Sequence, residues 1–155
     1  MQRAHLARFS FNNIGVLLDE EISLDIEALC EKIVRRNRGG YCFEHNKLFF
    51  HALDQLGYDV QFFLGRVTPE LHSDGPRTHR ITILKHEGKE YLIDVGFGPG
   101  VVRGLVPFSI DETFAFGETD ARIVVNEFSE YVLQSRKRGN VFSSLYTFDL
   151  ARYTD

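Results

Sequence analysis

The sequence is poor in cysteine and has no long apolar run. Its 155 residues include two cysteines, Cys30 and Cys42, which are too few for a framework of disulfide bonds. No apolar run approaches the ~18 residues that spanning a membrane requires, and the N-terminus lacks the apolar core of a signal peptide. We therefore expect a cytoplasmic protein in a reducing compartment, with no membrane partner.

An excess of positive charge is also missing. The chain has 18 Lys and Arg against 22 Asp and Glu, and this net charge of −4 disfavours a nucleic-acid partner bound through its phosphates. Hydrophobic residues make up 43% and charged residues 26%, which is an ordinary balance for a soluble globular protein. The length suffices for one sizeable core or two small ones.

Helical spacing marks the first third of the chain. A short helix and a loop are expected within residues 4–18, and a second helix should be capped by Ser23 or Asp25. Its apolar positions follow an i, i+3, i+4, i+7 pattern and place Cys30 in the core, at Ile26, Leu29, Cys30 and Ile33. A third helix is expected over residues 42–56 and should end at Gly57.

Alternating apolar residues take over after residue 57, which predicts strands. Strand-like runs separated by turn residues occur at 60–67, 78–85, 90–95, 122–126, 131–135 and 141–148. Successive hairpins of this kind indicate a small antiparallel barrel or sandwich. We therefore predict an α+β fold with a helical domain over residues 1–57 and a β domain over residues 58–155.

Cys42 is the strongest candidate for a reactive residue in the sequence. Gly39 and Gly40 permit a sharp turn just before it, and an amphipathic helix follows at once. At such a helix start, the unpaired N–H groups and the helix dipole favour a thiolate. The alternative interpretation is a cysteine buried merely as a small hydrophobic residue.

His79 and Asp94 are expected to share one face of a hairpin. If the loop between the strands at 78–85 and 90–95 has an even number of residues, these side chains are opposite or one diagonal step apart. A buried carboxylate beside a histidine fixes its tautomer and stabilises the imidazolium. The alternative is a structural pair without a catalytic role.

These residues together predict a nucleophilic site for acyl transfer. Cys42 would attack a carbonyl, His79 would move the proton, and Asp94 would orient His79. The backbone N–H of Cys42 would supply one oxyanion donor. His45 is a rival base without an evident carboxylate partner. We expect no metal, because Cys42, His45 and His51 on one helix lack a closing pair of ligands.

Three blocks in the sequence resemble the signature of the arylamine N-acetyltransferase family. They read Arg-Gly-Gly-Tyr-Cys-Phe-Glu-x-Asn at 38–46, Arg-Thr-His at 77–79 and Tyr-Leu-Ile-Asp-Val-Gly-Phe-Gly at 91–98. The resemblance implies a helical domain followed by a β-barrel, arranged as in cysteine proteases, with Cys42, His79 and Asp94 as the triad. It also implies ping-pong transfer of acetyl from acetyl-CoA to the nitrogen of arylamines and arylhydrazines, or to the oxygen of N-hydroxyarylamines.

The same resemblance suggests binding residues. Phe11, Val67 and Phe97 match positions that line the acceptor pocket, and aromatic walls suit a flat apolar amine. We assign Gly98, in a glycine-rich loop that forms a wall of the site, to acetyl-CoA. One departure is Asn12, since the family has a glutamate there that helps hold the segment around the nucleophile.

The resemblance also implies a short form. The sequence lacks the start of the first domain and the C-terminal third, which forms a lid in the family. Alternatives are therefore an amide synthase of the same fold, or a truncated, weakly active form that needs a partner chain. Apolar surface exposed without the lid would favour a homo-oligomer.

Overall fold

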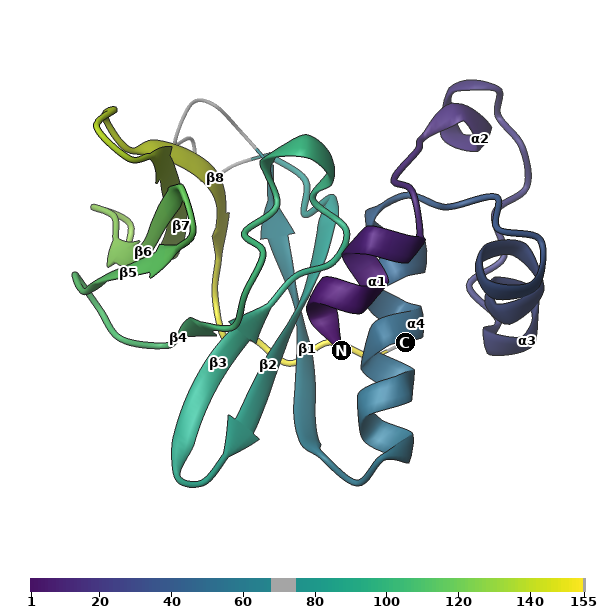
Figure 1. Ribbon diagram of the computed structural model, residues 1–155, viewed down its shortest axis with the longest axis horizontal. Coiled ribbons are helices and arrows are strands. Elements are labelled where there is room, and N and C mark those ends of the chain that lie inside the picture. The colour runs from purple at the N-terminus through teal and green to yellow at the C-terminus, as the bar shows by residue number, and fades with distance from the viewer. Residues whose placement is uncertain (68–74, 155) are drawn as a thin grey trace.

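The computed structural model describes residues 1–67 and 75–154, and Figure 1 shows helices beside a strongly curved sheet. The helices are α1 (Gln2–Arg8), α2 (Ile14–Leu17), α3 (Ile26–Leu29), the π-helix η1 (Cys30–Arg35), α4 (Cys42–Gln55) and the 3-10 turn η2 (Gly98–Gly100). The strands are β1 (Asp59–Arg66), β2 (His79–His86), β3 (Lys89–Ile93), β4 (Val106–Pro107), β5 (Thr113–Phe116), β6 (Thr119–Val125), β7 (Tyr131–Lys137) and β8 (Ser143–Phe148). None of the helices in these described ranges is long and apolar enough to cross a membrane.

Within the described residues, the eight strands form one antiparallel sheet in the order β4-β3-β2-β1-β8-β7-β6-β5. The segment after β4 bonds to two strands that are far apart in this order. The Phe108 N–H donates to the Glu90 carbonyl of β3, and the Asp111 N–H donates to the Ile123 carbonyl of β6, both at 2.8 Å. These bonds bring the sheet close to a closed barrel. The predicted α+β fold, with helices followed by a barrel-like antiparallel sheet, is confirmed, and the domain boundary at residue 57 stays a prediction.

Helix α4 joins the helices to the sheet. Its Phe49 and Leu53 pack with Leu84 of β2 and Ile93 of β3, and its Leu48 packs with Leu29 and Ile33 of the other helices. Strand β2 is therefore buried on both faces, because Ile81 and Ile83 point into the barrel core while α4 covers the other side. The N-terminal end of α4 is thus held against the sheet.

The hairpin between β2 and β3 has the predicted parity. Its turn consists of Glu87 and Gly88, which have φ values of +51° and +73°, the positive values that a type I′ turn requires. The two-residue loop pairs Ile83 with Leu92, so odd positions on β2 face even positions on β3. His79 and Asp94 consequently point to the same face, one diagonal step apart.

Several element predictions need correction. The segment at 4–18 holds two helices, α1 and α2, rather than one, and the second predicted helix is an α-helical turn that continues as the π-helix η1. Cys30 is half-buried at the edge of the helical core rather than inside it. The short strands β4 and β5 were not predicted. Asp25 does cap α3, because its Oδ1 accepts from the N–H groups of Glu27 and Ala28.

Candidate active site

Cys42 is the first residue of α4, and the segment before it is pinned to the stretch after α1. The Gly40 N–H donates to the Ser10 carbonyl at 3.3 Å, and the Asn12 N–H donates to the Gly40 carbonyl at 2.8 Å. Gly39 has φ of +69°, and a Cβ there would lie 2.1 Å from the Ser10 carbonyl oxygen. Only glycine fits this turn, which fixes where α4 begins.

Asn12 holds the segment before Cys42 through its side chain. Its Nδ2 donates to the Arg38 carbonyl at 2.7 Å, next to the glycine turn. An amide side chain thus ties down the segment before the nucleophile.

A buried ion pair holds the first turn of α4. Glu44 is 2% exposed, and its Oε2 accepts from the Tyr41 N–H at 3.0 Å. Its Oε1 lies 2.6 Å from Lys32 Nζ on the π-helix η1. This is the glutamate half of a capping box, with its charge balanced by a lysine from another helix. The contact fixes the backbone on both sides of Cys42.

His79 and Asp94 form a buried pair on the sheet. His79 Nε2 lies 2.7 Å from Asp94 Oδ2, and both side chains are almost fully buried. Asp94 Oδ1 accepts from Asn46 Nδ2 at 2.9 Å and from the Gly96 N–H at 2.8 Å. Since Nε2 is engaged with Asp94, Nδ1 is the nitrogen left to face Cys42, whose Sγ donates to the carbonyl of Thr78, the residue before His79, at 3.4 Å.

The electrostatics of the pair favour its charged state. Burial lowers the pKa of His79, but the charge of Asp94 and hydrogen bonds with Asp94 and Cys42 outweigh it and raise the pKa to about 9. Burial likewise raises the pKa of Asp94, but the charge of His79 and hydrogen bonds from His79, Asn46 and Gly96 bring it below its ordinary value. At pH 7 the site therefore presents an imidazolium to Cys42.

Two aromatic rings enclose the imidazole. The ring of Tyr146 lies 4.8 Å from that of His79, and the ring of Phe97 lies 5.3 Å from it, centroid to centroid. Burial and the charge of Asp94 raise the pKa of Tyr146 well above its ordinary value, so its hydroxyl stays neutral. The enclosure keeps water from the His79–Asp94 pair.

The other predicted binding residues, Phe11, Gly98 and Val67, are not among the rings packed on His79. Phe11 is 39% exposed, and its ring packs on Gly98, where a Cβ would come within 3.2 Å of it. Both residues line a cavity of about 240 Å³. Val67 is 48% exposed and comes two residues after Gly65, which pairs with His79. The structure thus brings Phe97 to His79 and Phe11 to Gly98, and it places Val67 beyond the end of β1.

The rival base His45 is engaged elsewhere. Its Nδ1 lies 2.9 Å from His5 Nε2, and its Nε2 lies 3.1 Å from the Ser10 carbonyl oxygen. Burial lowers the pKa of His45 despite the neighbouring Glu44 charge. Among the residues that the structure describes, no three His, Cys, Asp or Glu side chains gather where they could hold a metal ion.

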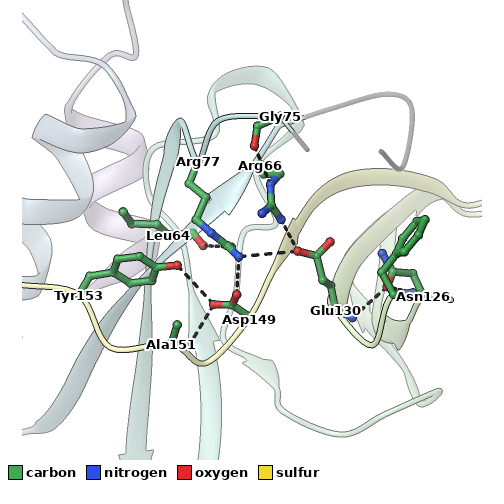
Figure 2. A network of polar contacts seen from close by, with 10 residues as sticks. Leu64, Arg66, Gly75, Arg77, Asn126, Glu130, Asp149, Ala151 and Tyr153 are labelled. Carbon is green, nitrogen blue, oxygen red and sulfur yellow. Dashed lines mark hydrogen bonds and ion pairs between the residues drawn. The ribbon is translucent and has the colours of Figure 1, made fainter. Parts of the chain in front are cut away.

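A polar network braces the start of β2, two residues before His79 (Figure 2). Arg77 donates to the Leu64 carbonyl of β1 at 3.1 Å and pairs with Asp149 just after β8. Glu130, just before β7, pairs with Arg66 and lies 3.7 Å from Arg77. These contacts tie together the ends of four strands beside the site.

The arrangement can support nucleophilic chemistry. A cysteine at a helix start, next to a protonated histidine whose other nitrogen holds a carboxylate, is the geometry of enzymes that transfer acyl groups through a thioester. The sequence predicted that Cys42, His79 and Asp94 form a reactive site, a role that stays a prediction, and it gave no role to Asn46 or Tyr146. Asn46 carried one signal, since it lies four residues after Cys42 and so on the same face of the helix.

Comparisons with known proteins identify the family. A family model described as N-acetyltransferase matches residues 1–154. An arylamine N-acetyltransferase / N-hydroxyarylamine O-acetyltransferase of Salmonella typhimurium is 38% identical over 148 residues, which cover 95% of this chain and 52% of the relative. The chain belongs to this N-acetyltransferase family, and the predicted resemblance to arylamine N-acetyltransferases is confirmed.

Solved structures agree with this identification. An arylamine N-acetyltransferase structure from Salmonella typhimurium superposes with a TM-score of 0.90 at 35% identity, covering 99% of this chain and 56% of that one. The Mycobacterium marinum arylamine N-acetyltransferase in complex with CoA gives a TM-score of 0.88 at 31% identity. The match covers 99% of this chain and 58% of that one. This chain therefore spans about half the length of the relatives that it matches.

Proposed function

We propose that this chain transfers acetyl from acetyl-CoA to small aromatic amines or hydrazines, with Cys42 as the nucleophile and His79 and Asp94 completing the triad. The observation that carries the proposal is the buried His79–Asp94 pair, 2.7 Å apart, with Cys42 Sγ at the carbonyl of Thr78, the residue before His79, in a member of the N-acetyltransferase family. The setting that we propose is the cytoplasm.

The first half of the reaction loads the cysteine. The Cys42 thiolate, stabilised by the His79 imidazolium and the α4 dipole, attacks the thioester carbonyl of acetyl-CoA. The Cys42 N–H donates to the oxyanion. When the bond to CoA breaks, His79 gives its proton to the leaving thiolate, so that acetyl-cysteine and CoA–SH form and His79 becomes neutral.

The second half of the reaction transfers the acetyl group from Cys42 to the amine. The amine nitrogen attacks the acetyl-cysteine, and the neutral His79 takes the proton that the nitrogen loses. The Cys42 thiolate leaves and the imidazolium is restored, which closes the cycle. Asp94 stays charged throughout and stabilises the imidazolium.

The substrate contacts are part of the same proposal. Phe97 lies against His79 and is proposed to form an aromatic wall of the acceptor pocket, with the more exposed Phe11 and Val67 also lining it. Gly98 is proposed to contact acetyl-CoA, and support for a CoA substrate comes from the related structure solved with CoA. Because the chain covers about half of its relatives, its acceptor range and any need for a partner chain or a second copy belong to the proposal.

Initial-rate kinetics test this function. Acetyl-CoA is varied at several fixed concentrations of an aromatic amine, and release of CoA thiol is followed. We expect parallel double-reciprocal lines, because each substrate meets a different form of the enzyme. Cys42→Ser should abolish the reaction, whereas Cys30→Ser, which changes the only other cysteine, should leave it nearly intact. Intersecting lines, or equal losses in the two variants, would refute the proposal.

A further inference from the structure

We propose that Asn46 is the positioning residue of this active site, because one side chain links the three elements that carry Cys42, His79 and Asp94. The inference rests on the proposed function for its catalytic consequence. Its structural basis is independent of substrate. Asn46 is 1% exposed and lies one helical turn beyond Cys42 on α4.

Three hydrogen bonds leave this amide toward the sheet. Asn46 Nδ2 donates to the Arg80 carbonyl of β2 at 2.6 Å and to Asp94 Oδ1 at 2.9 Å. Asn46 Oδ1 accepts from the Val95 N–H at 2.9 Å. The first bond reaches the residue next to His79, and the other two reach Asp94 and its neighbour. The amide therefore sets the position of α4 against both strands of the hairpin.

The orientation of the amide follows from its partners. The Val95 N–H can only donate, so it must face the side-chain oxygen, while the Arg80 carbonyl and the Asp94 carboxylate can only accept. A carboxylate of the same shape cannot satisfy this set, because even when protonated it has one O–H donor for the two acceptors. Asparagine is the residue that meets all three partners in its ordinary state.

The bond to Asp94 acts on the catalytic histidine. Together, Asn46 and the Gly96 N–H occupy Asp94 Oδ1, which leaves Oδ2 for His79. Donors to the charged carboxylate also lower the pKa of Asp94 and so keep the charge that holds the His79 proton. Asn46 thus acts through Asp94 and makes no contact with the reacting atoms in this scheme.

A close approach at Gly96 shows how tightly these parts meet. A Cβ at Gly96 would lie 2.7 Å from Asn46 Nδ2 and 2.8 Å from the Cys42 Cα and carbonyl oxygen. The start of α4 therefore sits directly on the turn that follows Asp94. Asn46 supplies the directional bonds at this contact, which packing alone does not provide.

The isosteric variant Asn46→Asp tests the proposal. The buried carboxylates at positions 46 and 94 would share one proton, and only the protonated form of the new side chain can donate to Asp94. We expect kcat to be highest at pH 6, where the protonated side chain keeps the bond to Asp94 but loses the bond to the Arg80 carbonyl, and to fall by about tenfold by pH 8.5, with KM for acetyl-CoA little changed. Asn140→Asp adds the same charge in an exposed turn and is the control.

Unfolding in urea provides a readout that does not require transferase activity. The free energy of unfolding of Asn46→Asp should fall, relative to Asn140→Asp, as the pH rises from 5 to 8, because the folded state binds the shared proton and the unfolded state does not. A pH-independent difference, or a kcat profile identical to that of the control, would overturn the proposal. Failure of the wild type to transfer acetyl would instead count against the proposed function.

A second variant, Asn46→Ala, tests the proposal in case Asn46→Asp does not fold. If Asn46→Asp stays unfolded at every pH, the uncharged Asn46→Ala is compared with wild type. We expect kcat to fall by about 10–100-fold with KM within a factor of about two, the usual range for a lost supporting hydrogen bond. Wild-type kcat in folded Asn46→Ala would refute the positioning role.

Discussion

Two buried histidines, His79 and His5, differ in charge at neutral pH because their neighbours differ. His79 faces the Asp94 carboxylate, and its pKa is raised to about 9. His5 faces another imidazole, that of His45, and its pKa is lowered to about 4 by burial and by the His45 charge. Burial alone would lower both values, so the carboxylate decides which histidine can act as an acid at neutral pH.

The His5 pair predicts a loss of stability in mild acid. In the unfolded chain His5 has its ordinary pKa of 6.5, so between pH 6.5 and 4 the unfolded state binds a proton that the folded state rejects. The free energy of unfolding should therefore fall as the pH drops through this range, by about 3 kcal/mol in total. Over the same window His79 is charged in both states, and the Asp94 effect begins only below its ordinary pKa.

Urea titrations at pH 7 and pH 4.5 measure this dependence. His5→Asn removes one of the two buried imidazoles whose pKa is lowered, so part of the difference between the two pH values should disappear, and the remainder is expected from His45. His86→Asn changes an exposed histidine and should leave the difference as in wild type. If His5→Asn kept the full pH dependence, the source would have to be another group.

At the scale of elements, helix α4 owes its position to contacts at its first turn. The Lys32–Glu44 pair reaches it from the π-helix η1, in which the Arg36 N–H bonds to the Glu31 carbonyl five residues back. Glu44 is buried, and Lys32 is 28% exposed in its side chain. A buried carboxylate that loses its cation is costly, because little water can replace the partner.

Removal of Lys32 should destabilise the fold. We expect Lys32→Met to lower the free energy of unfolding by about 3 kcal/mol, since Glu44 is left buried without a cation. The double variant with Glu44→Gln should recover much of this loss. Lys85→Met, which breaks an exposed pair with Glu90, should cost less than about 1 kcal/mol. A Lys32→Met cost no larger than that of Lys85→Met, in thermal or urea unfolding, would contradict the argument.

Local patterns were sufficient for the elements that carry the proposed triad. Gly39 and Gly40 before an apolar helical repeat located the start of α4. The sequence placed His79 and Asp94 on one face if the hairpin loop had an even number of residues, and the two-residue Glu87–Gly88 turn meets that condition. The π-helix was not predictable, because its apolar spacing over six residues resembles that of an α-helix. Strands β4 and β5 are two and four residues long, too short for an alternating pattern to show.

The supporting contacts of the site needed the tertiary structure. Asn46 is bonded to residues 34, 48 and 49 positions away, and no local pattern connects them. Cys30 follows the helical repeat of its neighbours, yet its turn lies at the edge of the helical core and leaves it half-buried. Sequence patterns thus predicted the proposed reactive groups, while the contacts that hold them in place became visible only in the tertiary structure.

For the whole molecule, the proposed reaction depends on how the helices meet the sheet. Cys42 comes from the helical part and His79 and Asp94 from the sheet, and Figure 1 shows α4 beside β1 and β2. Phe49 and Leu53 of α4 pack on this side of the sheet, and the network around Arg77 braces the strand ends near His79 (Figure 2). We therefore expect this chain, which spans about half the length of its relatives, to suffice for loading of Cys42 with acetyl.

The most direct measurement is the intact mass of the protein after mixing with acetyl-CoA in the absence of an amine, followed by peptide mapping. We predict one acetyl group on Cys42, none on Cys30, and its loss when an aromatic amine is added. The result that would contradict us is a folded protein whose Cys42 reacts with iodoacetamide but takes no acetyl group from acetyl-CoA.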